Sequence, residues 1–111
     1  MEAKYLGDFD DQEDVERAFQ TELGPDKKIL LACYDGGGYD GSGWVLIQDI
    51  PSGKLFEVNG SHCSCSGLED QWDEEETSVQ SLRNRLKDGH VGPYDYPVDE
   101  SLTEVLNRLY F

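Results

Sequence analysis

One histidine and two cysteines in a short segment are the residues best suited to chemistry in this sequence. They are His62, Cys63 and Cys65, and a third cysteine, Cys33, lies farther upstream. Thiolate and imidazole are ligands that Zn²⁺ prefers, and a Cys-x-Cys pair can converge on one ion if its loop folds suitably. The spacing differs from the paired Cys-x-x-Cys of zinc ribbons. A zinc site is therefore one hypothesis, with Cys33 or His90 completing the tetrahedron.

Two other interpretations of these residues stay open. The thiols can act as small buried hydrophobes while His62 hydrogen-bonds locally, which is a common role for free cysteines. A nucleophilic Cys63 with a histidine base would make the protein a thiol-dependent enzyme, but it would need a third, orienting group. The nearby glycine-rich segment at residues 34–43 lacks the Gly-Lys-Ser/Thr ending of a P-loop. It is predicted to be a turn between strands.

Negative charge is the strongest physical feature of the chain. Asp and Glu number 24 against 9 Lys and Arg in 111 residues, which gives a net charge of −15. Such a field repels nucleic acid and anionic membrane surfaces, since both attract Lys and Arg. It favours a basic protein or a multivalent cation and speeds the encounter with it. Solubility alone is the alternative explanation.

The carboxylates gather in two main clusters, which lack the alternation and the glycine of an EF-hand loop. Carboxylates distributed over a compact fold can imitate the phosphates of a nucleic acid and occupy the basic groove of an enzyme. Aromatic side chains nearby are candidates for apolar anchors. The residues predicted to bind a partner are Asp10, Asp11, Glu13, Asp14, Tyr39, Trp44, Glu69, Asp70, Trp72, Asp73, Glu74, Glu75 and Glu76.

The cellular setting is also predicted from composition. An odd number of cysteines argues against a disulfide framework. The sequence has no apolar run near the roughly 20 residues of a membrane span, and its start lacks the pattern of a signal peptide. These features predict a cytoplasmic protein.

Hydrophobic periodicity predicts three helices. The first begins at Asp10 or Asp11 and continues to the stop signal at residues 24–26. The second is capped by Thr77 and Gln80 and closes at residues 88–90, and the third is capped by Ser101 and Glu104.

Three strands are predicted between the first and second helices, at residues 28–34, 44–49 and 54–59. The first is a short, nearly continuous apolar run, which is typical of a strand buried on both faces. The other two flank a Pro and Gly turn and form a hairpin, with Phe56 and Val58 facing inward. The predicted fold is a single α+β domain spanning 1–111, in the order α-β-β-β-α-α. Its small three-stranded, mainly antiparallel sheet has helices packed on one face.

The central half of the chain resembles a group of small acidic proteins encoded by phages and prophages. The resemblance lies in Gly53-Lys54-Leu55-Phe56-Glu57-Val58-Asn59-Gly60-Ser61-His62-Cys63-Ser64-Cys65, Gly67-Leu68-Glu69, Gln71-Trp72 and Glu75-Glu76-Thr77. The group has no assigned activity, so the resemblance implies no catalytic or binding role for any residue of this chain. It implies a small accessory protein in the host cytoplasm, and many such proteins bind and block bacterial machinery.

Charge and resemblance together predict a non-enzymatic accessory protein. It would bind and inhibit a basic host nucleic-acid-handling or defence protein, such as a nuclease, without contacting nucleic acid or membrane directly. The alternatives are a small zinc-stabilised domain built on His62, Cys63 and Cys65, or a thiol-dependent enzyme. No cofactor other than zinc is predicted.

Overall fold

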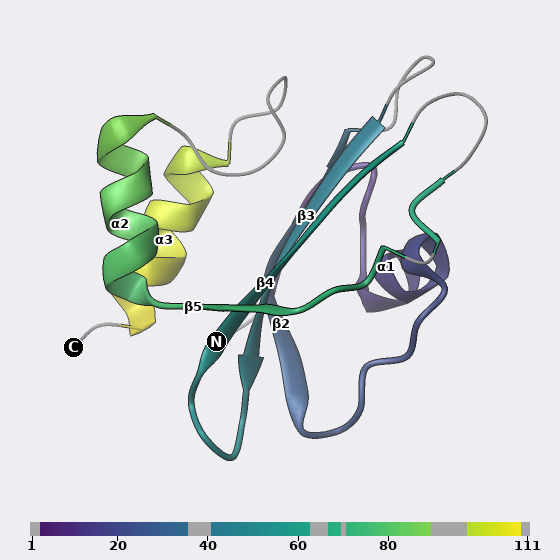
Figure 1. Cartoon of the computed structure of the whole chain (residues 1–111), viewed down its shortest axis with the longest axis horizontal. Coiled ribbons are helices and arrows are strands. Elements are labelled where there is room, and N and C mark those ends of the chain that lie inside the picture. The colour runs from purple at the N-terminus through teal and green to yellow at the C-terminus, as the bar shows by residue number, and fades with distance from the viewer. Residues whose placement is uncertain (1–2, 36–40, 63–66, 70, 90–97, 110–111) are drawn as a thin grey trace.

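Five strands form one mixed sheet in the part of the chain that the structure describes, in the order β1-β2-β3-β4-β5 (Figure 1). The structure is a computed structural model, and it describes residues 3–35, 41–62, 67–69, 71–89 and 98–109. The elements are β1 (Lys4–Gly7), α1 (Gln12–Phe19), β2 (Lys27–Asp35), β3 (Gly41–Asp49), β4 (Leu55–His62), β5 (Glu75–Thr77), α2 (Val79–Asp88) and α3 (Asp99–Leu109).

The predicted three-stranded sheet with helices on one face is wrong in strand number, element order and coverage. The fold remains α+β, but the described elements follow the order β-α-β-β-β-β-α-α. The two additional strands, β1 and β5, are edge strands of four and three residues. Segments this short do not show the period-two alternation by which a strand is recognised in sequence.

The helix α1 connects two parallel strands. Strand β1 pairs with β2 in parallel, in the register Lys4 to Leu31 through Gly7 to Tyr34. The predicted start of α1 is confirmed, because Asp11 is its N-cap and accepts a hydrogen bond from the backbone of Asp14. The helix ends earlier than predicted, because Gln20 adopts a left-handed conformation with φ of 54°.

Helices cover both faces of the sheet, with α1 on one side and α2 and α3 on the other (Figure 1). The α1 side is filled by a core of Phe9, Val15, Phe19, Ile29, Ala32, Val45, Ile47, Val58 and Leu68. The opposite side is filled by Leu30, Leu31, Cys33, Trp44, Leu46, Leu55, Leu82, Val98, Leu102, Val105 and Leu106. Burial of β2 on both faces is therefore confirmed.

The hairpin formed by β3 and β4 is also confirmed, with Val45 opposite Val58. Val58 faces the α1-side core as predicted, whereas Phe56 on the same face is only partly buried. The prediction missed that the other face is buried as well, by Leu55 and Glu57. The second helix begins one residue later than predicted. Ser78, rather than Thr77, is its N-cap and accepts a hydrogen bond from the backbone of Ser81.

Candidate functional site

The carboxyl ends of three strands, β1, β2 and β4, lie at the same end of the sheet, which we call the carboxyl edge to distinguish it from the edge strands β1 and β5. Strands β1 and β2 are parallel, and β4 runs in the same direction because β3 is antiparallel to both β2 and β4. This edge holds Asp8 after β1, Tyr34 near the end of β2, and His62 at the end of β4. In doubly wound α/β sheets the carboxyl ends of parallel strands hold the ligand sites, and here β1 and β2 are the one parallel pair among the described strands.

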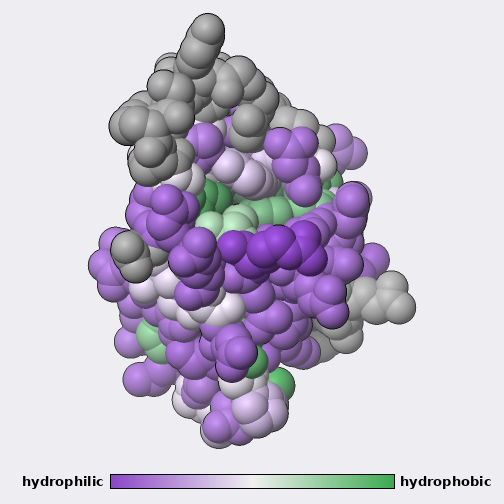
Figure 2. Space-filling view, turned by 90° about the vertical axis from the view of Figure 1, so that its right-hand side faces the viewer, coloured by the Kyte–Doolittle hydropathy of each residue, from purple (hydrophilic) through white to green (hydrophobic). Residues whose placement is uncertain are grey.

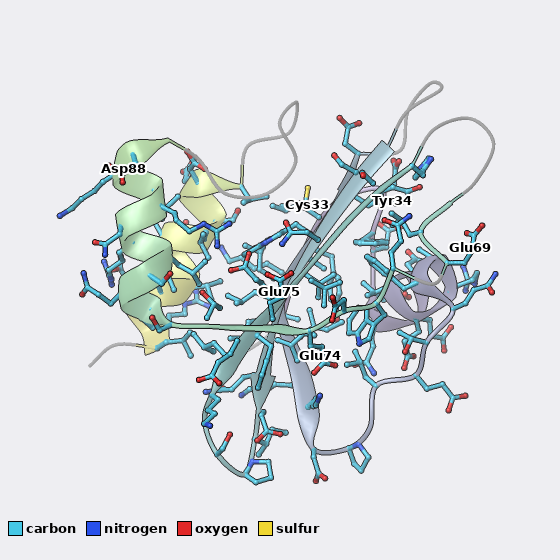
Figure 3. The ribbon with its side chains drawn as sticks, in the orientation of Figure 1. Cys33, Tyr34, Glu69, Glu74, Glu75 and Asp88 are labelled. Carbon is cyan, nitrogen blue, oxygen red and sulfur yellow. The ribbon has the colours of Figure 1, made fainter. Side chains whose placement is uncertain are left out.

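Tyr34 and His62 form the polar centre of this edge. The Tyr34 hydroxyl oxygen lies 2.6 Å from His62 Nε2, within hydrogen-bonding distance. The phenol ring also packs against Phe9, with 5.2 Å between the ring centroids. Burial raises the pKa of Tyr34, and the negative charges of Asp8 and Glu69 raise it further. Figure 3 places Tyr34 and Glu69 on the α1 side of the sheet.

Cys33 precedes Tyr34 in β2 and faces the opposite side of the sheet. Its side chain is fully buried in the core beneath α2 and α3. Burial raises the pKa of this thiol to about 12, with further contributions from the charges of Asp35 and Asp8. Cys33 therefore stays a neutral thiol near neutral pH and packs as a small hydrophobe.

We expect the Cys33 thiol to resist alkylation in the folded protein. Treatment with iodoacetamide near pH 8 should label Cys33 at least about 100-fold more slowly than in the urea-unfolded chain, because neither thiolate nor access is present. Peptide mapping by mass spectrometry measures the rate at this residue alone. Equal rates in the folded and unfolded chain would show that Cys33 is not buried as described.

The structure describes only two of the residues predicted to bind zinc. Cys63, Cys65 and His90 lie outside the described residues. The structure describes Cys33 and His62 and places them on opposite faces of the sheet. Cys33 packs in the core beneath α2 and α3, whereas His62 contacts Tyr34 on the α1 side. Among the described residues, no group of three His, Cys, Asp or Glu side chains could hold a metal ion. The site stays a prediction from sequence.

The two predicted carboxylate clusters approach each other around α1. Asp10, Asp11, Glu13 and Asp14 lie at the start of this helix. Trp72 packs edge-on against Phe19 of α1 at 5.1 Å, and Leu68 enters the same core. These contacts bring the segment that carries Glu69 and Asp73 to the α1 side.

The rest of the second cluster follows the outer edge of the sheet. Glu75 and Glu76 belong to β5, and Glu74 precedes it (Figure 3). Glu74 forms an ion pair with Lys27 and accepts a hydrogen bond from Trp72 Nε1 at 2.9 Å. Glu74 therefore links the segment that precedes β5 to Lys27 of β2.

The predicted aromatic anchors differ in where they lie. The ring of Trp44 is fully buried, and its Nε1 donates to Glu57 at 3.2 Å. Its ring therefore belongs to the core. Trp72 is only partly buried, on the α1 side. Tyr39 and Asp70 lie outside the described residues.

Charge is distributed unequally between the two sides of the sheet. Residues 8–23, which include α1, contain seven carboxylates and one base, Arg17. The described residues of 67–74 contain three carboxylates, Glu69, Asp73 and Glu74, and no base, and Glu74 pairs with Lys27 of β2. Helices α2 and α3 together hold four acids and four bases: Asp88, Asp99, Glu100, Glu104, Arg83, Arg85, Lys87 and Arg108. We call residues 8–23 with 67–69 and 71–74 the acidic face.

The acidic face contains a hollow that sequence patterns did not indicate. It has a volume of about 230 Å³ and is lined by Asp8, Phe9, Asp14, Arg17, Ala18 and Tyr34. Figure 2 looks onto this side and shows hydrophobic atoms at the floor of a hollow, with hydrophilic atoms around it. The hollow depends on parallel pairing of β1 and β2, which places the Asp8 backbone N–H 2.8 Å from the Tyr34 carbonyl oxygen. No local sequence signal reports such a pairing.

A second polar cluster lies under α2, on the other side of the sheet. Glu57 is 5% exposed and accepts hydrogen bonds from Arg85, Trp44 and Asn59, with the Arg85 nitrogen at 2.5 Å. Burial would raise the pKa of Glu57, but these hydrogen bonds and the Arg85 charge outweigh burial and lower it. The cluster attaches α2 to the sheet and has the character of a structural ion pair.

Comparison with protein families, curated proteins and solved structures finds no match to this chain. Across the described residues, no helix combines the length and the hydrophobicity needed to cross a membrane.

Proposed function

We propose that this protein is a non-enzymatic binding protein whose acidic face engages a basic surface on a partner protein. The observation that carries the proposal is the unequal distribution of charge. Carboxylates greatly outnumber bases on the α1 side, whereas acids and bases balance on α2 and α3. Charge that served only solubility would not need to favour one side of the sheet.

The arrangement suits steering and recognition. Asp10, Asp11 and Glu13 are exposed at the start of α1, where their charges can act on an approaching partner across about 10 Å of solvent. Complementary charge raises the association rate and rejects acidic competitors. Nucleic acid is an unsuitable ligand for this face because its phosphates carry the same sign of charge.

The partner class follows from the same chemistry. A basic groove that normally binds nucleic acid is complementary to a compact surface rich in carboxylates. The resemblance to small acidic phage proteins adds a host setting, so the partner would be a nucleic-acid-handling or defence protein, such as a nuclease, in the host cytoplasm. Occupation of its groove would inhibit it, with the present chain acting as a nucleic-acid mimic.

A capture experiment followed by reconstitution tests this function. The immobilised protein is exposed to bacterial lysate, captured proteins are identified, and each is purified and measured for direct binding and for inhibition of nucleic-acid binding. We expect a basic protein whose affinity falls by about tenfold or more between about 50 mM and about 500 mM salt. Candidate basic nucleic-acid-binding proteins that fail to bind, or that bind independently of salt, would contradict the proposal.

A further inference from the structure

The hollow on the acidic face combines an aromatic wall with carboxylates at its rim. Phe9 is almost fully buried, and its ring packs against that of Tyr34 at a centroid distance of 5.2 Å and an interplanar angle of 36°. Asp8 and Asp14 also line the hollow, which has a volume of about 230 Å³. Aromatic faces and carboxylates are the two groups that attract a flat organic cation.

We propose that this hollow binds an arginine side chain of the basic partner. The inference rests on the proposed function and names the contact that anchors it. A guanidinium group is planar, stacks on aromatic rings and forms paired hydrogen bonds with carboxylates. The guanidinium would lie on the partly exposed ring of Tyr34, against which the buried ring of Phe9 packs, and its methylene stem would lie against Ala18.

The protein's own Arg17 already shows that a guanidinium is compatible with this rim. Arg17 NH1 lies 3.2 Å from Asp14 Oδ1, while the Arg17 side chain remains 73% exposed. The second oxygen of Asp14 accepts a hydrogen bond from the backbone of Asp10 at 2.9 Å, which fixes the orientation of the carboxylate. An exposed ion pair of this kind is worth little to stability, so a partner arginine can displace Arg17 at small cost.

Arginine fits better than the alternatives. A phosphate or a carboxylate would meet Asp8 and Asp14 and be repelled, since the one base in the lining, Arg17, is already paired with Asp14. Lysine lacks the flat group that stacks on a ring and forms paired hydrogen bonds. A neutral side chain could occupy the apolar floor, but it would gain nothing from the charges at the rim.

The test uses a small probe and the full chain. N-acetyl-L-arginine methylamide is titrated into ¹⁵N-labelled protein, and the matching citrulline compound serves as a neutral analogue of nearly the same shape. We expect saturable shifts at the amides of Phe9, Arg17, Ala18 and Tyr34 with the arginine probe. The citrulline compound should bind at least about tenfold more weakly.

Two pairs of variants locate the binding. Ala18→Leu fills the hollow without changing charge and should lower the affinity for the arginine probe by about tenfold or more. Ala18→Ser keeps the hollow open and should bind the probe as tightly as the original protein does. If Ala18→Leu fails to fold, a second pair of variants is compared, Asp14→Asn and Glu13→Gln, each of which removes one negative charge. Asp14→Asn should lower the affinity for the arginine probe, and Glu13→Gln should not. Similar affinity for both probes, or undiminished binding in the folded Ala18→Leu or Asp14→Asn variant, would overturn the inference.

Failure here can be distinguished from failure of the proposed function. Salt-sensitive partner binding that is equally strong in Ala18→Leu and Ala18→Ser would retain the acidic face as an interface and exclude the hollow as its anchor. Absence of salt-sensitive partner binding in the original protein would overturn the proposed function itself. We expect Ala18→Leu to lower the affinity for the partner by about tenfold and Ala18→Ser to leave that affinity unchanged.

Discussion

Gly7→Ala is expected to lower the free energy of unfolding by at least about 3 kcal/mol. Gly7 ends β1 with φ of 65°, a conformation that side chains disfavour. A Cβ atom there would lie 2.2 Å from the backbone oxygen of Tyr34 and 3.0 Å from its carbonyl carbon. Backbone cannot move aside as a flexible side chain can, so the β1 and β2 pairing must distort. The hollow should be distorted with it.

Gly53→Ala is the matched control for the steric term. Gly53 also has positive φ, at 76°, but a Cβ atom there would meet nothing within 4 Å. Its cost should be about 1 kcal/mol, the conformational penalty alone. Urea denaturation measures both variants against the original protein. Equal costs at the two glycines would show that β1 does not approach Tyr34 as closely as described.

Glu57→Gln is expected to cost about 2 kcal/mol of stability near neutral pH. The amide keeps the shape of the side chain but loses the charge that holds Arg85. The pKa of Glu57 is lowered in the folded protein from its ordinary value of 4.5. Its ionised form therefore stabilises the fold above that value, and this stability is lost as the pH falls through the lowered pKa.

The pH dependence separates the ion pair from simple loss of packing. The difference in unfolding free energy between the original protein and Glu57→Gln should be full near pH 7 and should shrink as the medium becomes acidic below about pH 4.5. Glu76→Gln is the control, because Glu76 and Lys54 are 4.0 Å apart and more than half exposed. It should change stability by less than about 0.5 kcal/mol. A Glu57→Gln cost that is constant with pH would contradict the role assigned to the carboxylate.

The centre of the sheet was predictable because its strands are long and apolar. Residues 29–34 form a continuous run of hydrophobic and aromatic residues, and the hairpin of β3 and β4 is marked by Pro and Gly at its turn. The helices were predictable from their hydrophobic spacing, and the cap of α1 was predicted correctly. The predicted caps of the other two were wrong, because Ser78 caps α2 and α3 begins at Asp99, two residues before Ser101. Local chemistry determined these elements, so local patterns were sufficient to find them.

The edge strands and the coverage of both faces depend on tertiary contacts. Strand β1 is recognisable only from its pairing with β2, across the whole of α1. Glu57 looks like the outward member of an alternating strand, yet Arg85 covers it from α2, 28 positions along the chain. Polar residues that are buried with a distant partner give no local signal of burial.

The candidate site was partly predictable for the same reason. The acidic clusters and His62 were evident from composition and residue type, whereas the Tyr34 contact with His62 joins two strands that are not adjacent in the sheet. Alternation along β2 does indicate that Cys33 and Tyr34 face opposite sides. The hollow required the parallel pairing of β1 and β2, which the sequence did not suggest.

The affinity of two charge-matched variants for one purified partner tests the acidic face most directly. Glu13→Gln with Glu22→Gln removes two charges from this face, and Asp88→Asn with Glu100→Gln removes two from α2 and α3. Glu13 and Glu100 are each the second residue of a helix, so their helical contexts match. Near 50 mM salt we expect the first variant to bind about tenfold more weakly and the second to change by less than about twofold. Equal weakening in both, or no weakening in either, would contradict an interface on the α1 side.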